Sequence, residues 1–220
     1  MPTQSPSIAF IGGTGPEGLG LAMRFARAGN EVIIGSRRQE RCDEAAEKVL
    51  SAVPNGKIRG MVNPEAVAAG DVIFITVPYD GQREMLEQIK DGVAGKTVVD
   101  TVVPLRFAKG KISTLSVEEG SAAEEAQAVL TGSTVVGAFH NLSAKELMDL
   151  EHEVPCDVVV CGDDAEAKQT VMDLAVGIAG VRAIDGGGLE NSRYVEGITA
   201  LLLNINRIYK TQSSIRLVGV

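Results

Sequence analysis

Six residues near the N-terminus have the types and spacing needed to bind a pyrophosphate: Gly13, Thr14, Gly15, Pro16, Glu17 and Gly18. They follow a run of small and branched apolar residues, and a helix is expected to begin beside Pro16, which suits a first helical turn. The first glycine permits a tight turn, the second lets the backbone approach a phosphate, and the third lets helix pack on strand. The helix N-terminus adds N–H donors and a positive dipole end. The motif predicts a dinucleotide site, with an ordinary strand-to-helix turn as the alternative.

The end of the next apolar segment indicates which dinucleotide binds. Eighteen residues after Gly18 the chain reads Gly35-Ser36-Arg37-Arg38, with Arg41 one helical turn beyond Arg37. A site for NAD would place Asp or Glu here to bind the ribose 2′-hydroxyl, whereas a hydroxyl and guanidinium groups suit a 2′-phosphate. Ser36, Arg37, Arg38 and Arg41 therefore predict NADP(H). The alternative is a solvated arginine cluster.

Residues that follow the later strands should face the same cleft, because ligands of open α/β sheets bind beyond the carboxyl ends of the strands. Val77 and Pro78 offer an apolar shelf for a nicotinamide ring. His140 is the titratable aromatic residue there, and it suits either a general acid or a group that stacks and hydrogen-bonds. The chain has no Tyr-x-x-x-Lys sequence. A cleft poor in acids and bases favours a hydride acceptor that delocalises its own negative charge, as flavin-like rings do.

The elements that must position these residues alternate between strand and helix. Strands are predicted at 7–11, 31–34, 58–61, 72–77, 97–103, 134–138, 157–161 and 182–185, and helices at 17–28, 39–52, 64–69, 80–88, 122–131, 165–178 and 190–210. This alternation predicts an α/β, Rossmann-type doubly wound, mostly parallel sheet with a small C-terminal extension. We expect residues 1–140 to form the NADP-binding domain and residues 141–220 a smaller part that completes the cleft.

The composition of the chain limits the classes of molecule that can be its partners. The 220 residues carry a net charge of −8, which argues against nucleic acid and anionic membranes as partners. No apolar run reaches the roughly 18 residues needed to span a bilayer, and the polar residues 1–7 show no secretory signal, so a cytoplasmic protein is expected. Three cysteines and two histidines lack the spacing of a metal site, so we predict no metal.

Several motifs together resemble the F-420-dependent NADP oxidoreductase family, whose members exchange hydride between NADP(H) and the 8-hydroxy-5-deazaflavin coenzyme F-420. They are IGGTGPEGLG, GSRR, TVP, AFHN, CGDD and LENSRYVEGIT, followed by LLLNINR, and they extend over nearly the whole chain. The resemblance implies that Thr14 to Glu17 hold phosphates, with Glu17 acting through its backbone, and that Ser36, Arg37 and Arg41 bind the 2′-phosphate. It further implies that Val77, Gly81, Leu142 and Ala144 line the nicotinamide side, and that His140 and the tail around Ile215 face the deazaflavin.

Two other functions remain open: a soluble NADPH-dependent ferric or flavin reductase, and a non-catalytic NADP-sensing module. The apolar stripe of the last predicted helix, with Val195, Ile198 and Leu202, is typical of core or of a homodimer contact. Arg193 suits an ion pair with Glu196 or with an anionic coenzyme tail. Asp163 and Asp164 are better placed for a helix N-cap than for a metal.

Overall fold

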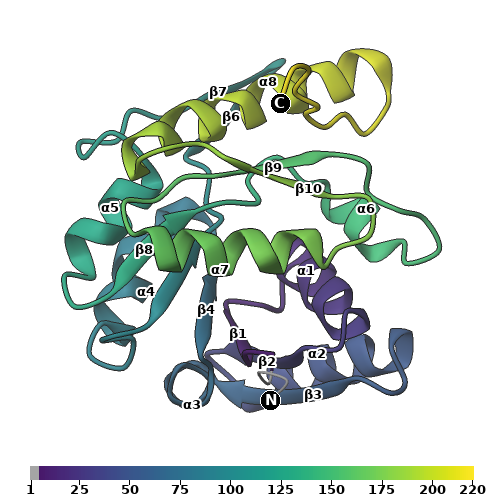
Figure 1. The fold of residues 1–220 in the computed structure, drawn as a ribbon, viewed down its shortest axis with the longest axis vertical. Helices are drawn as coiled ribbons and strands as arrows, with labels where there is room; N and C mark the ends of the chain where they lie inside the picture. Colours follow the sequence, from purple (N-terminus) through teal and green to yellow (C-terminus); the bar gives the residue numbers. More distant parts are fainter. Residues whose placement is uncertain (1–4) are drawn as a thin grey trace.

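A parallel six-stranded sheet forms the centre of the protein in a computed structural model that describes residues 5–220 (Figure 1). Its strands, in spatial order, are β3 (Lys57–Val62), β2 (Glu31–Ser36), β1 (Ile8–Ile11), β4 (Val72–Ile75), β5 (Thr97–Asp100) and β8 (Thr134–Gly137). The order reverses beside β1, because β2 pairs with one edge of β1 and β4 with the other. Such a switch point is where open α/β sheets bind ligands.

Helices cover both faces of this sheet. The apolar side chains of α1 (Pro16–Arg27), α2 (Gln39–Ala52) and α7 (Ala165–Val176) share one buried cluster on one face. Those of α3 (Asn63–Ala69), α4 (Gln82–Ile89) and α5 (Ala122–Val129) share a second cluster on the other face. Burial on both faces explains why the central strands are continuously apolar. The predicted doubly wound fold is therefore confirmed.

The C-terminal part adds a second layer of elements above the carboxyl ends of the strands. The parallel strands β9 (Asp157–Val160) and β10 (Arg182–Asp185) pair with each other, and an isolated bridge from Cys161 to Gly137 links them to β8. The long helix α8 (Ser192–Tyr209) lies at the end of the molecule opposite the N-terminus (Figure 1). Short 3-10 turns, η1 (Tyr79–Gly81) and η2 (Leu189–Asn191), precede α4 and α8.

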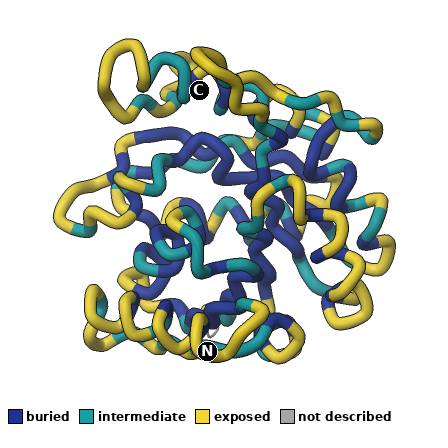
Figure 2. The backbone as a smooth tube through the Cα atoms, turned by 180° about the vertical axis from the view of Figure 1, so that it is seen from behind, coloured by how far each residue is buried: buried dark blue, intermediate teal, exposed yellow. Residues whose placement is uncertain are grey.

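Three elements, two strands and one helix, were missing from the sequence prediction. The chain forms an antiparallel hairpin of β6 (Leu105–Ala108) and β7 (Lys111–Thr114), which packs against α8, and a short helix α6 (Ala144–Met148), which packs against α1. Figure 2 shows the buried chain running through the middle of the molecule, with exposed segments at the periphery and around the C-terminus. No helix within residues 5–220 is long and apolar enough to cross a membrane.

Four phenylalanines form the packed layer beneath the later strand ends. Phe74 and Phe139 have ring centroids 5.4 Å apart, and Phe25 meets Phe139 edge-on at 5.9 Å. All four rings, including Phe10, are fully buried. Phe139 adopts a φ of 68°, a conformation that few residues other than glycine adopt. The packing of its ring thus fixes an unusual backbone turn directly before His140.

Candidate active site

The glycine turn after β1 lets α1 pack on it as the sequence predicts, but its residue in the left-handed region is Gly12, one position before the predicted motif. Gly12 has a φ of +75°, and a Cβ on Gly18 would lie 2.7 Å from the Cα of Gly13. Helix α1 therefore packs directly on the turn only because Gly18 lacks a side chain. A Cβ on Gly15, in contrast, would meet no atom within 4 Å. Gly15 is also the N-cap of α1 and offers no side chain to its N–H groups, so the helix start is open to an anionic ligand.

A first cavity, here called the nucleotide cavity, extends from this turn across the end of β2. It has a volume of about 610 Å³. Its walls come from the glycine turn, the end of β2 and the start of α4, and its lining includes Gly12, Thr14, Gly15, Pro16, Glu17, Ser36, Arg37, Asn63, Thr76, Val77, Pro78, Gly81, Glu84, Met85 and Gln88. The glycine turn, the Ser36 hydroxyl group and the Arg37 guanidinium group thus line one cavity. This is the arrangement that a dinucleotide with a 2′-phosphate requires.

The predicted arginines divide into two groups. All three arginines are exposed, but Arg37 lines the nucleotide cavity, whereas Arg38 and Arg41 are absent from its lining. Arg38 is instead the N-cap residue of α2, and Arg41 lies in the first turn of that helix. Among the three, the structure brings Arg37 together with Ser36.

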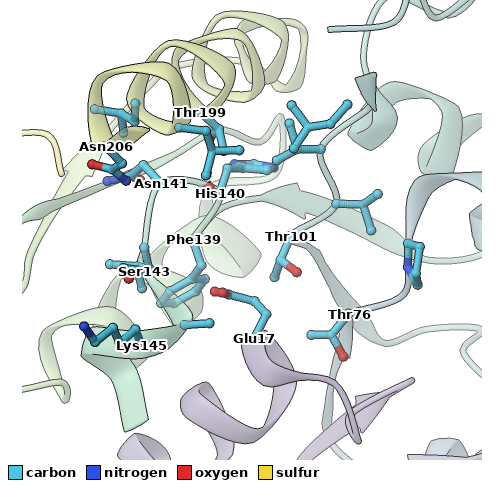
Figure 3. A pocket seen from close by; sticks show the side chains of 18 of the residues that line it. Glu17, Thr76, Thr101, Phe139, His140, Asn141, Ser143, Lys145, Thr199 and Asn206 are labelled. Carbon is cyan, nitrogen blue, oxygen red and sulfur yellow. Dashed lines mark hydrogen bonds between the residues drawn. The ribbon is translucent and has the colours of Figure 1, made fainter. Parts of the chain in front are cut away.

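A second cavity, here called the acceptor cavity, adjoins the first and has a volume of about 410 Å³. It lies between the start of α1 and the helix α8 (Figure 3). Its lining includes the predicted residues Val77, Pro78, His140, Leu142 and Ala144, together with Glu17, Thr76, Tyr79, Thr101, Val102, Val103, Leu105, Phe139, Asn141, Ser143, Lys145, Thr199, Leu202, Leu203, Asn206, Gln212 and Ser213. Four residues line both cavities: Glu17, Thr76, Val77 and Pro78.

His140 lies in the acceptor cavity with an unused hydrogen-bonding capacity. The residue is 5% exposed, and neither nitrogen of its ring has a hydrogen-bond partner among the described residues. Its carbonyl oxygen accepts a hydrogen bond of 2.9 Å from Thr199 Oγ1, which ties this loop to α8. Burial lowers the pKa of His140 to about 4, so the imidazole is neutral at pH 7 and can offer one donor and one acceptor to a ligand.

The position of Glu17 shows that the expectation of a cleft poor in acids is wrong. Its side chain reaches from the start of α1 into the space beside Phe139 and Thr101 (Figure 3). The residue as a whole is half-buried, but its Oε1 atom is removed from solvent and has no hydrogen-bond partner among the described residues. Burial raises the pKa of Glu17 to about 8, so the carboxyl group is mostly protonated at pH 7. Sequence reasoning considered only the backbone of this residue.

The C-terminal tail reaches the acceptor cavity through residues other than Ile215. Gln212 and Ser213 line the cavity, and the Ser143 hydroxyl group donates a 2.6 Å hydrogen bond to Gln212 Oε1. Ile215 is absent from the lining, and its carbonyl oxygen accepts a hydrogen bond of 2.8 Å from the backbone N–H of Asp157. The predicted contact of Ile215 with the cleft is therefore not present in this structure, because β9 holds that part of the tail.

Two polar residues outside the cavities, Arg193 and Asp164, form contacts within the protein. Arg193 forms an ion pair of 2.8 Å with Glu124 on α5, not with Glu196, whereas its contact with an anionic coenzyme tail stays a prediction. Asp164 caps α7 by accepting a 2.8 Å hydrogen bond from Ala167 N, as expected. Within residues 5–220 no group of three or more potential metal ligands gathers at one place.

Comparisons with known proteins agree with this geometry. Residues 7–104 match the family model described as "NADP oxidoreductase coenzyme F420-dependent". The chain is 45% identical over 213 residues to the "F420-dependent NADP reductase" of Methanocaldococcus jannaschii, covering 94% of this chain and 95% of that protein. It is 46% identical over 205 residues to the protein of the same name from Methanothermobacter thermautotrophicus, covering 90% of this chain and 88% of that protein.

A solved structure shows the same fold along the whole chain. The crystal structure of a putative F420-dependent NADP reductase from Arthrobacter sp. FB24 superposes with a TM-score of 0.82 at 23% identity, covering 96% of this chain and 99% of that one. At this identity the likeness speaks for the fold alone. The sequence identity to the archaeal reductases establishes kinship, and the chain belongs to the family of coenzyme F-420-dependent NADP oxidoreductases.

Proposed function

We propose that this protein is an oxidoreductase that transfers hydride reversibly between NADP(H) and the deazaflavin coenzyme F-420. The observation that carries the proposal is the shared wall of the two cavities, where Val77 and Pro78 line both. Residues that line both cavities make the two cavities adjacent, so two flat rings can stack face to face where the cavities meet, and proximity and alignment supply much of the catalysis of a direct hydride transfer. The family membership supports the identity of both coenzymes.

On this proposal each part of the nucleotide cavity has a role. The backbone of Thr14 to Gly18 and the start of α1 bind the pyrophosphate, with Gly13 shaping the turn. Ser36 and Arg37 bind the 2′-phosphate, and the exposed Arg38 and Arg41 add positive charge near it. Val77, Pro78 and Gly81 place the nicotinamide ring at the shared wall.

The acceptor cavity then binds the deazaflavin ring. Leu142 and Ala144 provide an apolar surface, and the neutral His140 hydrogen-bonds the polar edge of the ring. Lys145 is the cationic residue among those lining this cavity, so it suits the anionic part of the coenzyme. Ile215 supports the site indirectly by anchoring the tail that carries Gln212 and Ser213.

We also propose the division of labour between residues 1–140 and 141–220. The residues that line the nucleotide cavity lie between positions 12 and 88, whereas the acceptor cavity takes residues from both parts. The C-terminal part thus completes a cleft that the Rossmann part begins.

Our proposal includes a cytoplasmic setting with small-molecule redox coenzymes as partners and neither nucleic acid nor membrane. Cys42, Cys156 and Cys161 are free thiols, which fits a reducing compartment. The outer side of α8 exposes Tyr194, Ile198, Leu201, Ile208 and Tyr209, and we propose that a second copy of the chain covers this face. Sedimentation should show a dimer for the native chain and a monomer for Leu201→Glu.

The experiment that tests the proposed function compares acceptors under identical conditions. Purified protein and NADPH are mixed with F-420, free flavin or a ferric chelate, and the consumption of NADPH is followed. We expect rapid turnover with F-420 and little with the others. Preferred turnover of flavin or ferric chelate would make the protein a flavin or metal reductase. Binding of NADPH without turnover of any acceptor would make it a nucleotide sensor.

A further inference from the structure

One carboxylic acid occupies the place where the two cavities meet. Glu17 lines both the nucleotide cavity and the acceptor cavity, and among the residues lining the acceptor cavity it is the one with a carboxyl group. It projects from the first turn of α1, whose backbone is fixed by the contact between Gly18 and Gly13. Its position is therefore set by the same turn that is shaped for the phosphates.

The surroundings leave this carboxyl group without a structural partner. Its Oε1 atom is buried and accepts no hydrogen bond from the described residues. Five other titratable or charged side chains line the two cavities. They are Arg37 after β2, Tyr79 in η1, Glu84 in α4, His140 after β8 and Lys145 in α6. None of them contributes to the shift of its pKa, which burial alone raises. A buried polar atom without a partner is costly, so it calls for a ligand or a function.

Hydride transfer between a nicotinamide and a deazaflavin leaves one proton to be placed. When a C–H bond at nicotinamide C4 breaks and a C–H bond at deazaflavin C5 forms, the nicotinamide ring becomes cationic and the acceptor ring gains a negative charge. One proton, bound to a ring nitrogen of the acceptor, completes its neutral dihydro form. NADPH, the deazaflavin and one proton thus give NADP⁺ and the dihydrodeazaflavin, and the reverse reaction returns that proton.

We propose, building on the proposed function, that the carboxyl group of Glu17 is the donor and acceptor of this proton. In the forward direction Glu17 gives its proton to the reduced acceptor and becomes a carboxylate beside the oxidised nicotinamide ring. In the reverse direction it takes the proton back. Because Glu17 lines both cavities, its one carboxyl group can respond to both rings.

A consequence arises that can be measured without any acceptor. A positive charge within about 4–6 Å of a carboxyl group lowers its pKa by about 1–3. NADP⁺ has a cationic nicotinamide ring and NADPH a neutral one, so NADP⁺ should expel the proton of Glu17 on binding and NADPH should not. Protons exchanged by the 2′-phosphate are common to both nucleotides and cancel in the difference.

Isothermal titration calorimetry at pH 7, in two buffers of different ionisation enthalpy, counts these protons. For the native protein we expect NADP⁺ to release about 0.4–0.9 proton more than NADPH does. The affinity for NADP⁺ should also rise by up to about tenfold per pH unit as the pH increases toward 8, relative to the affinity for NADPH. Glu17→Gln, which resembles the protonated acid, should abolish both differences while it still binds NADPH.

Glu84→Gln is the matched control, because Glu84 lines the nucleotide cavity but is exposed. It should keep the native difference in proton release. Glu17→Leu gives a second test, and thermal unfolding of each variant shows whether the fold is intact. Equal proton release by the two nucleotides in the native protein, or a difference that persists in Glu17→Gln, would overturn the proposal. Turnover of F-420 is measured on the same samples, so that a protein that shows the proton difference without turnover refutes the proposed function instead.

Discussion

Gly12 and Val77 approach each other so closely that a Cβ on Gly12 would lie 2.4 Å from Val77 Cγ1. The glycine turn after β1 and the apolar shelf after β4 are therefore one packed unit. Because Val77 lines both cavities, this contact fixes the place where the two cavities adjoin. On the proposed function, we expect this pair of residues to position the nucleotide and its acceptor relative to each other.

Substitutions at two glycines of the turn should have different effects. Gly12→Ala meets Val77 at a φ of +75°, and we expect it to lower the free energy of unfolding by about 1–3 kcal/mol. Gly15→Ala has open space within the protein, so its fold should be retained while its affinity for NADPH falls at least about tenfold. Urea unfolding and nucleotide titration of both variants provide the measurement. Unchanged NADPH binding by Gly15→Ala would show that the nucleotide does not approach this residue.

Selectivity for the 2′-phosphate should depend on Arg37 more than on its neighbours. Arg37→Ala should weaken NADPH binding by about 1.5–3 kcal/mol and leave NADH binding nearly unchanged, because a charge-assisted hydrogen bond is lost only with NADPH. Arg38→Ala is the matched comparison, since Arg38 does not line the nucleotide cavity, and it should weaken NADPH binding less than Arg37→Ala does. Equal losses for the two nucleotides would mean that Arg37 does not bind the phosphate.

His140 should affect binding of the acceptor more than the rate of the chemical step. For His140→Gln we expect a higher KM for F-420 with a smaller change in kcat, because the neutral imidazole and the amide both hydrogen-bond a ligand. Burial keeps the pKa of His140 at about 4, so the native rate should show no ionisation of this group between pH 6 and 7. A collapse of kcat with an intact fold would instead identify an essential acid or base.

Asp157 should stabilise the C-terminal part above acidic pH. The Arg182 guanidinium donates two hydrogen bonds of 2.8 Å to this fully buried carboxylate, and Leu217 N donates a third. These contacts hold the pKa of Asp157 at about 2 against an ordinary value of 3.8. The stabilisation is therefore complete above about pH 4 and is lost as the pH falls through about 2.

Asp157→Asn should lower the free energy of unfolding at pH 7 by about 1–3 kcal/mol, and the difference from the native protein should shrink below pH 3. Urea unfolding at both pH values tests this, with the exposed Asp173→Asn as control. A loss that is independent of pH would attribute the effect to packing instead of to the charge of Asp157.

The sequence was sufficient to predict the six parallel strands of the sheet, because five of them contain continuous apolar runs between clear turns, whereas β3 carries Lys57 and Arg59 and has a weaker signal. The β6–β7 hairpin escaped prediction because its strands, although no shorter than β1 or β4, carry Arg106 and Lys111 on an exposed surface and have no continuous apolar run. Helix α6 is equally short, but a signal was present: Ser143 and Glu146 have capping-box spacing, and Ser143 Oγ accepts from Glu146 N.

The residues of the candidate site also differ in how far they could be predicted from the sequence. The glycine turn and Ser36-Arg37 could be found in the sequence because their residue types and their spacing identify them directly. The burial of Glu17 was not, because it depends on the loop after β8 and on α6, more than 120 residues away. The path of the tail also depends on a distant partner, since the N–H of Asp157 binds the Ile215 carbonyl.

The central claim is direct hydride transfer between two coenzymes whose rings stack where the two cavities meet. The measurement that tests it most directly is the transfer of deuterium from C4 of stereospecifically labelled NADPH in a single turnover with F-420. We expect the label at C5 of the deazaflavin without loss to water, because stacked rings leave solvent no access to the hydride. Loss of the label to solvent, with nonenzymatic exchange excluded by controls, would contradict the account.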